Sequence, residues 1–302
     1  MASSSHNGVV IGSLKASTEN LGDYIQILAC LRLLEKLDLR PSIYLDRDTE
    51  LAGAPALESS SGPVLLPLNG WFKRTTGADP HWPPHERIIP IFVGFHIRPH
   101  QCPALLEQPS IDYMRAHGPV GCRDPVTMRA LEAKGVSTYL SHCLSLSFAK
   151  RKPDEVGDTV VVASRDREII DVLPPEYRNN HIYVNHYMVR DGFSQYLTEA
   201  KSFLAFYRTR ARLVITTFLH CALPCIAMGI PVVAFLPRPQ NDLQRISDEE
   251  RFSGLMQIAP VHRFGSAANV DWSPRPLDVE GLKEKILLDF QKRVAAALAA
   301  AR

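Results

Sequence analysis

The sequence lacks paired cysteines and a strong charge of either sign. Its six cysteines are scattered and form no CxxC pair, so the pattern indicates neither a dithiol redox motif nor a zinc-ribbon site. The 34 basic and 32 acidic residues leave a formal net charge of +2, which provides no general field for nucleic acid. We therefore expect a protein with no bound metal and no nucleic-acid partner.

Membrane and export signals are missing as well. Proline, glycine or charge interrupts every apolar run before it reaches the ~20 residues that a membrane-spanning helix needs. The opening MASSSHNGVVIGSL has no charged segment followed by a long apolar one, so we expect no secretory signal. Scattered cysteines are typical of a reducing compartment. These absences favour a cytoplasmic protein.

The chain also lacks the phosphate-binding signatures of common nucleotide enzymes. It contains neither GxGxxG after a strand nor the P-loop pattern. The sequence therefore supports neither dinucleotide binding nor nucleotide hydrolysis through those motifs.

What the chain does have is an alternation of strand-like and helix-like segments. Its 302 residues are 45% hydrophobic, and this length is comfortable for two domains. Runs such as VVIGS and TVVVAS alternate with helical patterns such as DYIQILACLRLLEKLDL, which predicts an α/β fold with mostly parallel sheets. The charged stretch AKRKPDEVGD, residues 149–158, is the expected linker. We predict domains over residues 1–150 and 151–302, with a C-terminal helix capped by Asp278.

A histidine interrupts an otherwise apolar segment, TTFLHCALPCIAMGIPVVAF at residues 216–235. Strand-like runs precede and close this segment, which predicts a helix between them. Pro224 lacks an N–H and is tolerated only near the first turn or at a kink, which puts His220 near the helix N-terminus. Open α/β sheets bind ligands at that point, and the helix dipole favours anions. We expect His220 to be catalytic; a histidine satisfied within the packing is the alternative.

Arg123 occupies a similar place in the first half. The segment VGCRDPVTMRALEAKGVSTYL predicts strand, helix, strand, with Asp124 as the helix N-cap and Pro125 as the first helical residue. A guanidinium immediately before the cap could bind a carboxylate or phosphate at two points. An internal ion pair with Asp124 or another acid is the alternative.

The loop STENLGDYIQ leads from the first strand into the first helix. Gly22 allows close approach of backbone or ligand. Asn20 or Asp23 can cap the helix or form a hydrogen bond with a ligand hydroxyl. Capping explains both residues equally well, so the loop alone leaves both interpretations open.

Taken together and in order, these segments resemble the polysaccharide pyruvyl transferase family. The matching motifs are N-x-G-D at 20–23, GCRDP at 121–125 and LVIT-x-x-LH with GIPV at 213–232. Further segments look like a subgroup of that family from surface-polysaccharide clusters, namely LNGWFKR at 68–74, PIFVGFHI at 90–97 and SHCLSLSF at 141–148. The resemblance covers most of the chain.

The resemblance implies two Rossmann-like domains facing each other across a cleft, as in GT-B glycosyltransferases. It implies phosphoenolpyruvate as donor, with no other cofactor. The implied acceptor is a glycan or lipid-linked oligosaccharide of a surface or exopolysaccharide precursor, which receives a pyruvyl ketal. Residues 1–150 would form the acceptor side and residues 151–302 the donor side. A lipid-linked acceptor would bring the protein to the membrane surface.

In such a reaction each candidate residue would have its own role. His220 would move protons near neutral pH, while Arg123 and the helix start at His220 would bind the donor's carboxylate and phosphate. Asp23 would stabilise positive charge at C2 of the donor. Asn20 and Gly22 would contact the substrate.

Some positions depart from the family pattern. The family often has arginine two residues before its histidine, where this chain has Phe218, and an Asp-Pro where this chain has SHC at 141–143. We expect Lys15 or Arg165, both at predicted carboxyl ends of strands, to supply the missing anion contact.

An aromatic group offers a platform for the acceptor sugar. Trp71, Phe72 and Trp82 lie near Lys73 and Arg74 in the sequence, although a turn followed by a core aromatic would give the same pattern. Two other functions fit the chain. A GT-B glycosyltransferase using a nucleotide sugar would share the fold, and a non-catalytic carbohydrate-binding relative would fit the departures from the family pattern.

Overall fold

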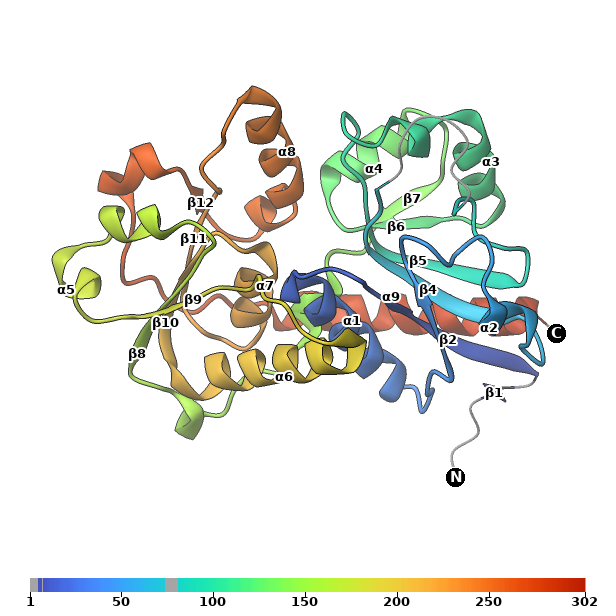
Figure 1. The fold of residues 1–302 in the computed structure, drawn as a ribbon, viewed down its shortest axis with the longest axis horizontal. Helices are drawn as coiled ribbons and strands as arrows, with labels where there is room; N and C mark the ends of the chain where they lie inside the picture. The colour runs from blue at the N-terminus through green and yellow to red at the C-terminus, as the bar shows by residue number, and fades with distance from the viewer. Residues whose placement is uncertain (1–4, 7, 74–80, 302) are drawn as a thin grey trace. The chain divides into compact units, whose positions relative to one another are not determined.

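Two separate sheets of mostly parallel strands organise the chain in a computed structural model that describes residues 5–6, 8–73 and 81–301. Helices connect most of the successive strands in both sheets (Figure 1). The α/β class predicted from the alternation is confirmed, and each sheet with its helices is consistent with a Rossmann-like domain.

The first sheet has the order β1-β2-β4-β5-β6-β7, with β3 paired to β2. Its pairings are parallel except for the antiparallel pair of β1 and β2. The strands are β1 (Ser5–His6), β2 (Val9–Lys15), β3 (Ile43–Asp46), β4 (Val64–Trp71), β5 (Ile88–His96), β6 (Val120–Cys122) and β7 (Thr138–Leu140).

Helices pack on both faces of this sheet. The helices concerned are α1 (Leu21–Glu35), α2 (Pro55–Glu58), α3 (Gln108–Ala116), α4 (Pro125–Glu132) and α9 (Glu280–Ala300). Successive strand residues point to opposite faces. Leu66 and Leu68 of β4 share a core cluster with Leu57 of α2 and Ile111 of α3. The next residue, Asn69, donates a hydrogen bond to an α1 carbonyl at 3.2 Å.

The second sheet is parallel throughout and has the order β12-β11-β10-β8-β9. Its strands are β8 (Thr159–Ala163), β9 (Ile182–Val184), β10 (Ala211–Thr216), β11 (Val232–Phe235) and β12 (Val261–His262). Its helices are α5 (Pro175–Arg178), α6 (Gly192–Arg210), α7 (Leu219–Ala227) and α8 (Asp242–Phe252). Val162 and Ile215 pack with Ile169 and Tyr177 in a core cluster on one face, and α6 and α7 contact β10.

The two compact units are interleaved along the chain. The first comprises residues up to Ser17, Gln26–Leu144 and the residues from Glu284 onward; the second comprises Thr18–Ile25 and Ser145–Lys283. Helices α1 and α9 therefore each contribute residues to both units. The predicted division of labour between an acceptor side and a donor side stays a prediction.

Local helix signals were predicted well. Asp124 caps α4 by accepting a hydrogen bond from the Thr127 N–H at 2.9 Å, and Pro125 is the first helical residue. Asp278 accepts from the Glu280 N–H at 3.1 Å at the start of α9. Both predicted caps are confirmed, because capping depends only on residues within one turn.

Candidate functional site

The second sheet reverses its strand order between β8 and β10. The chain places β9 on one side of β8 and then β10 on the other. Open parallel sheets bind ligands outside the carboxyl ends of strands at such a reversal. β8 ends at Ala163 and β10 at Thr216, so the residues that follow these strands belong to the candidate site.

His220 begins the helix at this edge, as predicted. It is half-buried, whereas the residues after it in α7 are buried. Its φ of −88° and ψ of 17° are not helical. Pro224, four residues later, lacks the N–H that would have bonded the His220 carbonyl, so the irregular backbone falls where the helical hydrogen bond is missing.

Hydroxyl groups hold the two strand ends together beside His220. The Ser164 and Thr217 hydroxyls lie 2.8 Å apart, and both residues are buried. Thr216 donates through its hydroxyl to the Ala163 carbonyl at 2.7 Å and accepts from the Phe218 N–H at 2.9 Å. The backbone that leads into α7 is therefore fixed by hydrogen bonds from side chains.

The first turn of α1 lies against His220 within the same unit. A Cβ atom added at Gly22 would lie 3.2 Å from the Cβ and Cδ2 atoms of His220 and 3.1 Å from the Asn20 Oδ1. The Gly22 N–H donates to that Oδ1 at 3.0 Å. Asp23, 9% exposed, accepts from the Thr18 hydroxyl at 2.8 Å. The structure thus brings Gly22 against the predicted histidine, with Asn20 at its side.

Lys15 and Arg165 lie in different units. Arg165 is exposed at the end of β8, and its guanidinium carbon lies 4.8 Å from the centre of the Tyr187 ring. Tyr187 forms a bridge with Asn20, so Arg165 belongs to the neighbourhood of the candidate site in the second unit. Lys15 ends β2 of the first unit and forms an ion pair with Glu50 at 3.0 Å.

Phe218 fills the position where the family often has arginine. Its side chain is 9% exposed and stacks on His186, with ring centres 4.8 Å apart. His186 is fully buried, and its Nε2 lies 2.7 Å from the Tyr207 hydroxyl. The position therefore supplies aromatic packing in place of charge.

The first unit carries Arg123 at the end of β6, as predicted. Its side chain is 3% exposed, and the backbone N–H of Arg123 donates to the Phe95 carbonyl at 2.8 Å. The Arg123 Nε lies 3.8 Å from the Asp124 Oδ2. That same oxygen lies 2.6 Å from the Nδ1 of His96, at the end of β5. The internal partner that the sequence offered as an alternative for Arg123 is present.

Burial and charge determine the protonation of this network. His96 is 0% exposed; burial, helped by Arg123, lowers its pKa to about 4 and keeps it neutral. Burial would raise the pKa of Asp124, but the His96 hydrogen bond, Arg123 and the Thr127 N–H hold it below its usual value. Near neutral pH the network is therefore an ionised carboxylate between a neutral imidazole and a guanidinium.

Trp71 and Arg98 extend this edge toward β4. Trp71 is the register partner of His96 on the neighbouring strand. The guanidinium carbon of Arg98 lies 4.1 Å from the Trp71 ring centre, within cation–π range. Among the described residues, the Trp71 Nε1 and the His96 Nε2 are buried without a hydrogen-bond partner. Two buried polar nitrogens therefore stand at the ends of adjacent strands.

The prediction of an aromatic platform for the acceptor sugar is wrong for two of its three aromatic residues. Phe72 and Trp82 are 0% and 8% exposed, and both pack against Phe95 in the core. Arg74 lies outside the described residues. Of the three aromatic residues, Trp71 alone remains for a substrate contact, and that role stays a prediction.

Sequence reasoning missed the polar residues at adjacent strand ends. His96 is the last residue of β5, next to last in PIFVGFHI, and Ser164 and Thr217 directly follow β8 and β10. The available signal was a polar residue directly after a buried strand. Choosing among such residues requires the strand order, which the sequence pattern does not contain.

These features define an α/β protein with polar and basic side chains at the carboxyl ends of parallel strands in each of two sheets. A family model described as polysaccharide pyruvyl transferase matches residues 20–238. This match spans more than half of the chain, and the protein belongs to that family.

Other comparisons give less. No curated protein matches the chain. A crystal structure of a functionally uncharacterized protein from Klebsiella pneumoniae subsp. pneumoniae NTUH-K2044 has a TM-score of 0.49 and 12% sequence identity. The matched region covers 83% of this chain and 91% of the Klebsiella chain. Within the part of the chain that the structure describes, no helix has both the length and the apolarity needed to cross a membrane.

Proposed function

We propose that the protein transfers a pyruvyl group from phosphoenolpyruvate to two hydroxyls of a sugar in a surface or exopolysaccharide precursor. The product is a cyclic ketal. The observation that carries this proposal is the family match over residues 20–238, because that range contains both Arg123 and His220.

The edge of the second sheet suits an anionic donor. His220 stands at a helix start next to the strand reversal, where the helix dipole attracts anions. Arg165 adds a guanidinium in the same unit. This arrangement supports binding of a carboxylate or phosphate even though position 218 carries no charge.

The proposed reaction balances without an external redox partner. One sugar hydroxyl adds to C2 of phosphoenolpyruvate as C3 gains a proton, and the C2–O bond to phosphate then breaks. The second hydroxyl adds to the cationic C2. Of the two hydroxyl protons, one ends on C3 and one on phosphate. His220 is the proposed carrier, since an imidazole both accepts and donates protons near neutral pH.

The first unit suits recognition of a polar ligand. Arg123 and Arg98 supply buried guanidinium groups, and Asp124 holds a single negative charge beside Arg123. Phosphoenolpyruvate carries two anionic groups, so Arg123 is proposed to bind one of them. Trp71 is proposed to contact the acceptor.

The proposal has finer parts that rest on the family. They are a GT-B-like pairing of the two Rossmann-like domains, a lipid-linked or free glycan acceptor and a cytoplasmic location. All six cysteines are described, are buried and form no disulfide, which supports a reducing compartment.

The deciding experiment measures phosphate release from phosphoenolpyruvate with a panel of free and lipid-linked glycans. Acceptor-dependent phosphate release, with a pyruvyl ketal found in the product by mass spectrometry, is expected. A matched series with nucleotide sugars covers the glycosyltransferase alternative. Sugar transfer without use of phosphoenolpyruvate would overturn the proposal.

A carbohydrate-binding relative without catalysis is the second candidate. The specific observation in its favour is Phe218, whose buried ring on His186 replaces a charge that many family members have. Glycan binding with no phosphate release across the whole panel would favour this candidate.

A further inference from the structure

A small pocket opens at the carboxyl ends of β11 and β12, on the same sheet that carries His220. It has a volume of about 170 Å³. The residues after β11, the start of η6 (Phe264–Asn269) and α8 form its walls. β11 is the direct neighbour of β10 in the sheet. The pocket therefore lies at the ligand-binding edge, but beyond the residues assigned above.

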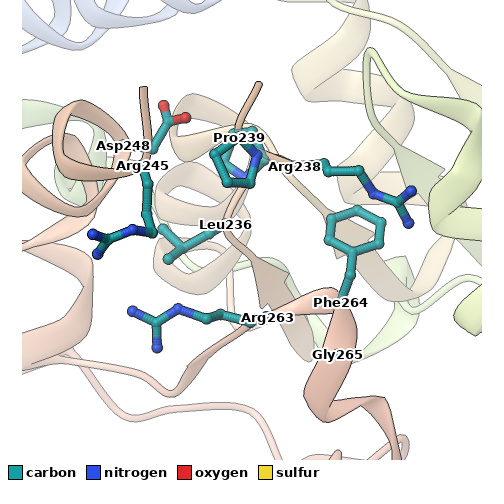
Figure 2. Close-up of a pocket in the computed structure, with 9 residues that line it drawn as sticks. Leu236, Arg238, Pro239, Arg245, Asp248, Arg263, Phe264 and Gly265 are labelled. Atoms are coloured by element: carbon teal, nitrogen blue, oxygen red, sulfur yellow. The ribbon is translucent and has the colours of Figure 1, made fainter. Parts of the chain in front are cut away.

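The pocket has an apolar interior with an aromatic wall. Leu236, Pro239 and Phe264 surround it, with Arg245 and Arg263 on one side and Arg238 on the other (Figure 2). Phe264 is half-buried and packs beside Phe235, with ring centres 5.6 Å apart. An aromatic face attracts the slightly positive C–H bonds of a saturated ring.

The charges around the pocket are balanced. Arg238 pairs with Glu168, and Arg263 pairs with Glu249 at 2.5 Å. The remaining ion pairs are Arg245 with Asp242 and Glu249 at 3.5 and 3.4 Å, and Arg251 with Asp248 at 3.9 Å. Each guanidinium of this group thus has a carboxylate partner, and no surplus charge remains to favour an anion.

Balanced charges still provide hydrogen bonds of both kinds. The side chains of Arg245 and Arg263 are 45% and 63% exposed, so their remaining N–H groups can donate to a ligand. Asp248, 2% exposed, lines the pocket; its Oδ2 already accepts from the Gln244 side chain at 2.8 Å, and a carboxylate oxygen can accept more than one hydrogen bond. A neutral ligand with several hydroxyls matches this mixture of donors and acceptors.

Size restricts that ligand to one ring. A cavity of about 150 Å³ holds a single benzene molecule, and this pocket is slightly larger. A pyranose sugar combines the size of one ring, an apolar C–H face and surrounding hydroxyls. Phenolic or nucleobase rings offer fewer hydroxyls to these donors and acceptors than a sugar does.

We propose that this pocket is a subsite for one neutral pyranose ring of the acceptor glycan. The ring would pack on Phe264, with its hydroxyls bonded by Arg245, Arg263 and Asp248. The identity of the glycan as acceptor rests on the proposed function, whereas sugar binding does not. The acceptor would then contain more than one sugar, and part of it would be bound by the second unit.

Binding is tested first with methyl glucosides and galactosides, by saturation-transfer and chemical-shift titration in NMR. A single ring in a shallow pocket is expected to bind with a Kd on the order of 1–10 mM. Methyl glucuronide is the charged comparison. Glucuronide binding more than about tenfold tighter than glucoside binding, and weakened by salt, would assign the pocket to an anion and overturn the proposal.

Gly265 offers a way to fill the pocket without disturbing the fold. It lines the pocket, and a Cβ atom at this position would meet nothing within 4 Å. Gly281 in α9 has equally open space and is the matched control. Gly265→Leu should weaken sugar binding at least tenfold, and Gly281→Leu should leave it within about twofold. Equal binding by the two variants would also overturn the proposal.

Kinetics separate this inference from the proposed function. With a long acceptor, Gly265→Leu should raise the acceptor KM and leave kcat and the phosphoenolpyruvate KM unchanged. With a single-sugar acceptor its KM should match that of Gly281→Leu. The protein could bind sugar in a way that Gly265→Leu abolishes and still release no phosphate from phosphoenolpyruvate. That result would refute the proposed function and support the subsite.

Discussion

The carboxyl edges of the two sheets handle polarity in opposite ways. In the first unit, Asp124 is buried with a neutral His96, 2.6 Å from its Oδ2, and with Arg123, 3.8 Å from the same oxygen. In the second unit, half-buried His220 lies in the first turn of α7, three residues after Thr217, whose hydroxyl pairs with that of Ser164. One edge uses buried charge, whereas the other uses neutral hydroxyls and a more accessible imidazole.

The difference shows where proton transfer and where orientation can be expected. A buried ionic network is costly to disturb, because removing one partner leaves a charge uncompensated. Such a network suits a rigid binding surface. A half-buried histidine in the first turn of a helix suits proton transfer. We therefore expect chemistry to depend on the second edge and substrate positioning on the first.

The largest expected effect is the loss of the second edge's histidine. His220→Ala should fold normally and lose ~10²–10⁴-fold in turnover, the range for a missing acid–base group. His220→Asn keeps a hydrogen-bonding side chain but cannot carry protons, so it should be nearly as poor. Phosphate release under saturating phosphoenolpyruvate measures both variants. Substantial activity in His220→Asn would restrict the residue to positioning.

Breaking the first edge should affect affinity and stability together. His96→Leu leaves the Asp124 carboxylate short of a donor, and should lower the free energy of unfolding by about 1–3 kcal/mol and raise the phosphoenolpyruvate KM. His96→Asn keeps an N–H near the Nδ1 position and should restore most of the unfolding free energy and most of the affinity for phosphoenolpyruvate. His96→Gln places its amide near the Nε2 position and is the control. Equal rescue by Gln and Asn would contradict a role through Asp124.

The contact between Gly22 and His220 can be tightened by one methyl group. In Gly22→Ala the new Cβ would lie 3.2 Å from His220, so the imidazole must shift by a few tenths of an ångström. We expect about a tenfold loss of kcat, since small misplacements of a reacting group are costly. Gly53→Ala, where the added Cβ meets nothing within 4 Å, is the matched control. Unchanged kcat in Gly22→Ala would mean that this contact does not position the histidine.

The smallest effect concerns the acid stability of the first unit. Burial, together with Lys285, lowers the pKa of His142 to about 4 from an ordinary 6.5. Between pH 4 and 6.5 the unfolded chain therefore binds more protons than the folded chain. The contribution of His142 to the free energy of unfolding is complete above pH 6.5 and is lost as the pH falls toward 4. Urea unfolding measures the loss of unfolding free energy between pH 7 and pH 5. This loss should be smaller in His142→Asn than in the unmodified protein, by up to about 1 kcal/mol. Asn suits the φ of 57° at this position, and an unchanged pH dependence would refute the assignment.

Local order and family membership could be predicted from the sequence. Alternating strand and helix patterns gave the α/β class. The cap at Asp124 followed from the Asp-Pro pair, and the pyruvyl transferase motifs gave the family later matched over residues 20–238. Each of these depends on neighbours along the chain or on motif order. The placement of His220 at a helix start could be predicted because Pro224 restricts the turn before it.

Only the tertiary structure decided which distant residues meet. His96 and Asp124 are 28 positions apart and come together because β5 and β6 are neighbours in the sheet. Gly22 meets His220 because Thr18–Ile25, which includes the first turn of α1, belongs to the same unit as α7. Strand order and chain crossover are set by burial of whole faces rather than by local preference. For that reason the sequence by itself determined the helices, strands and family, and the fold alone selected the partners of the candidate residues.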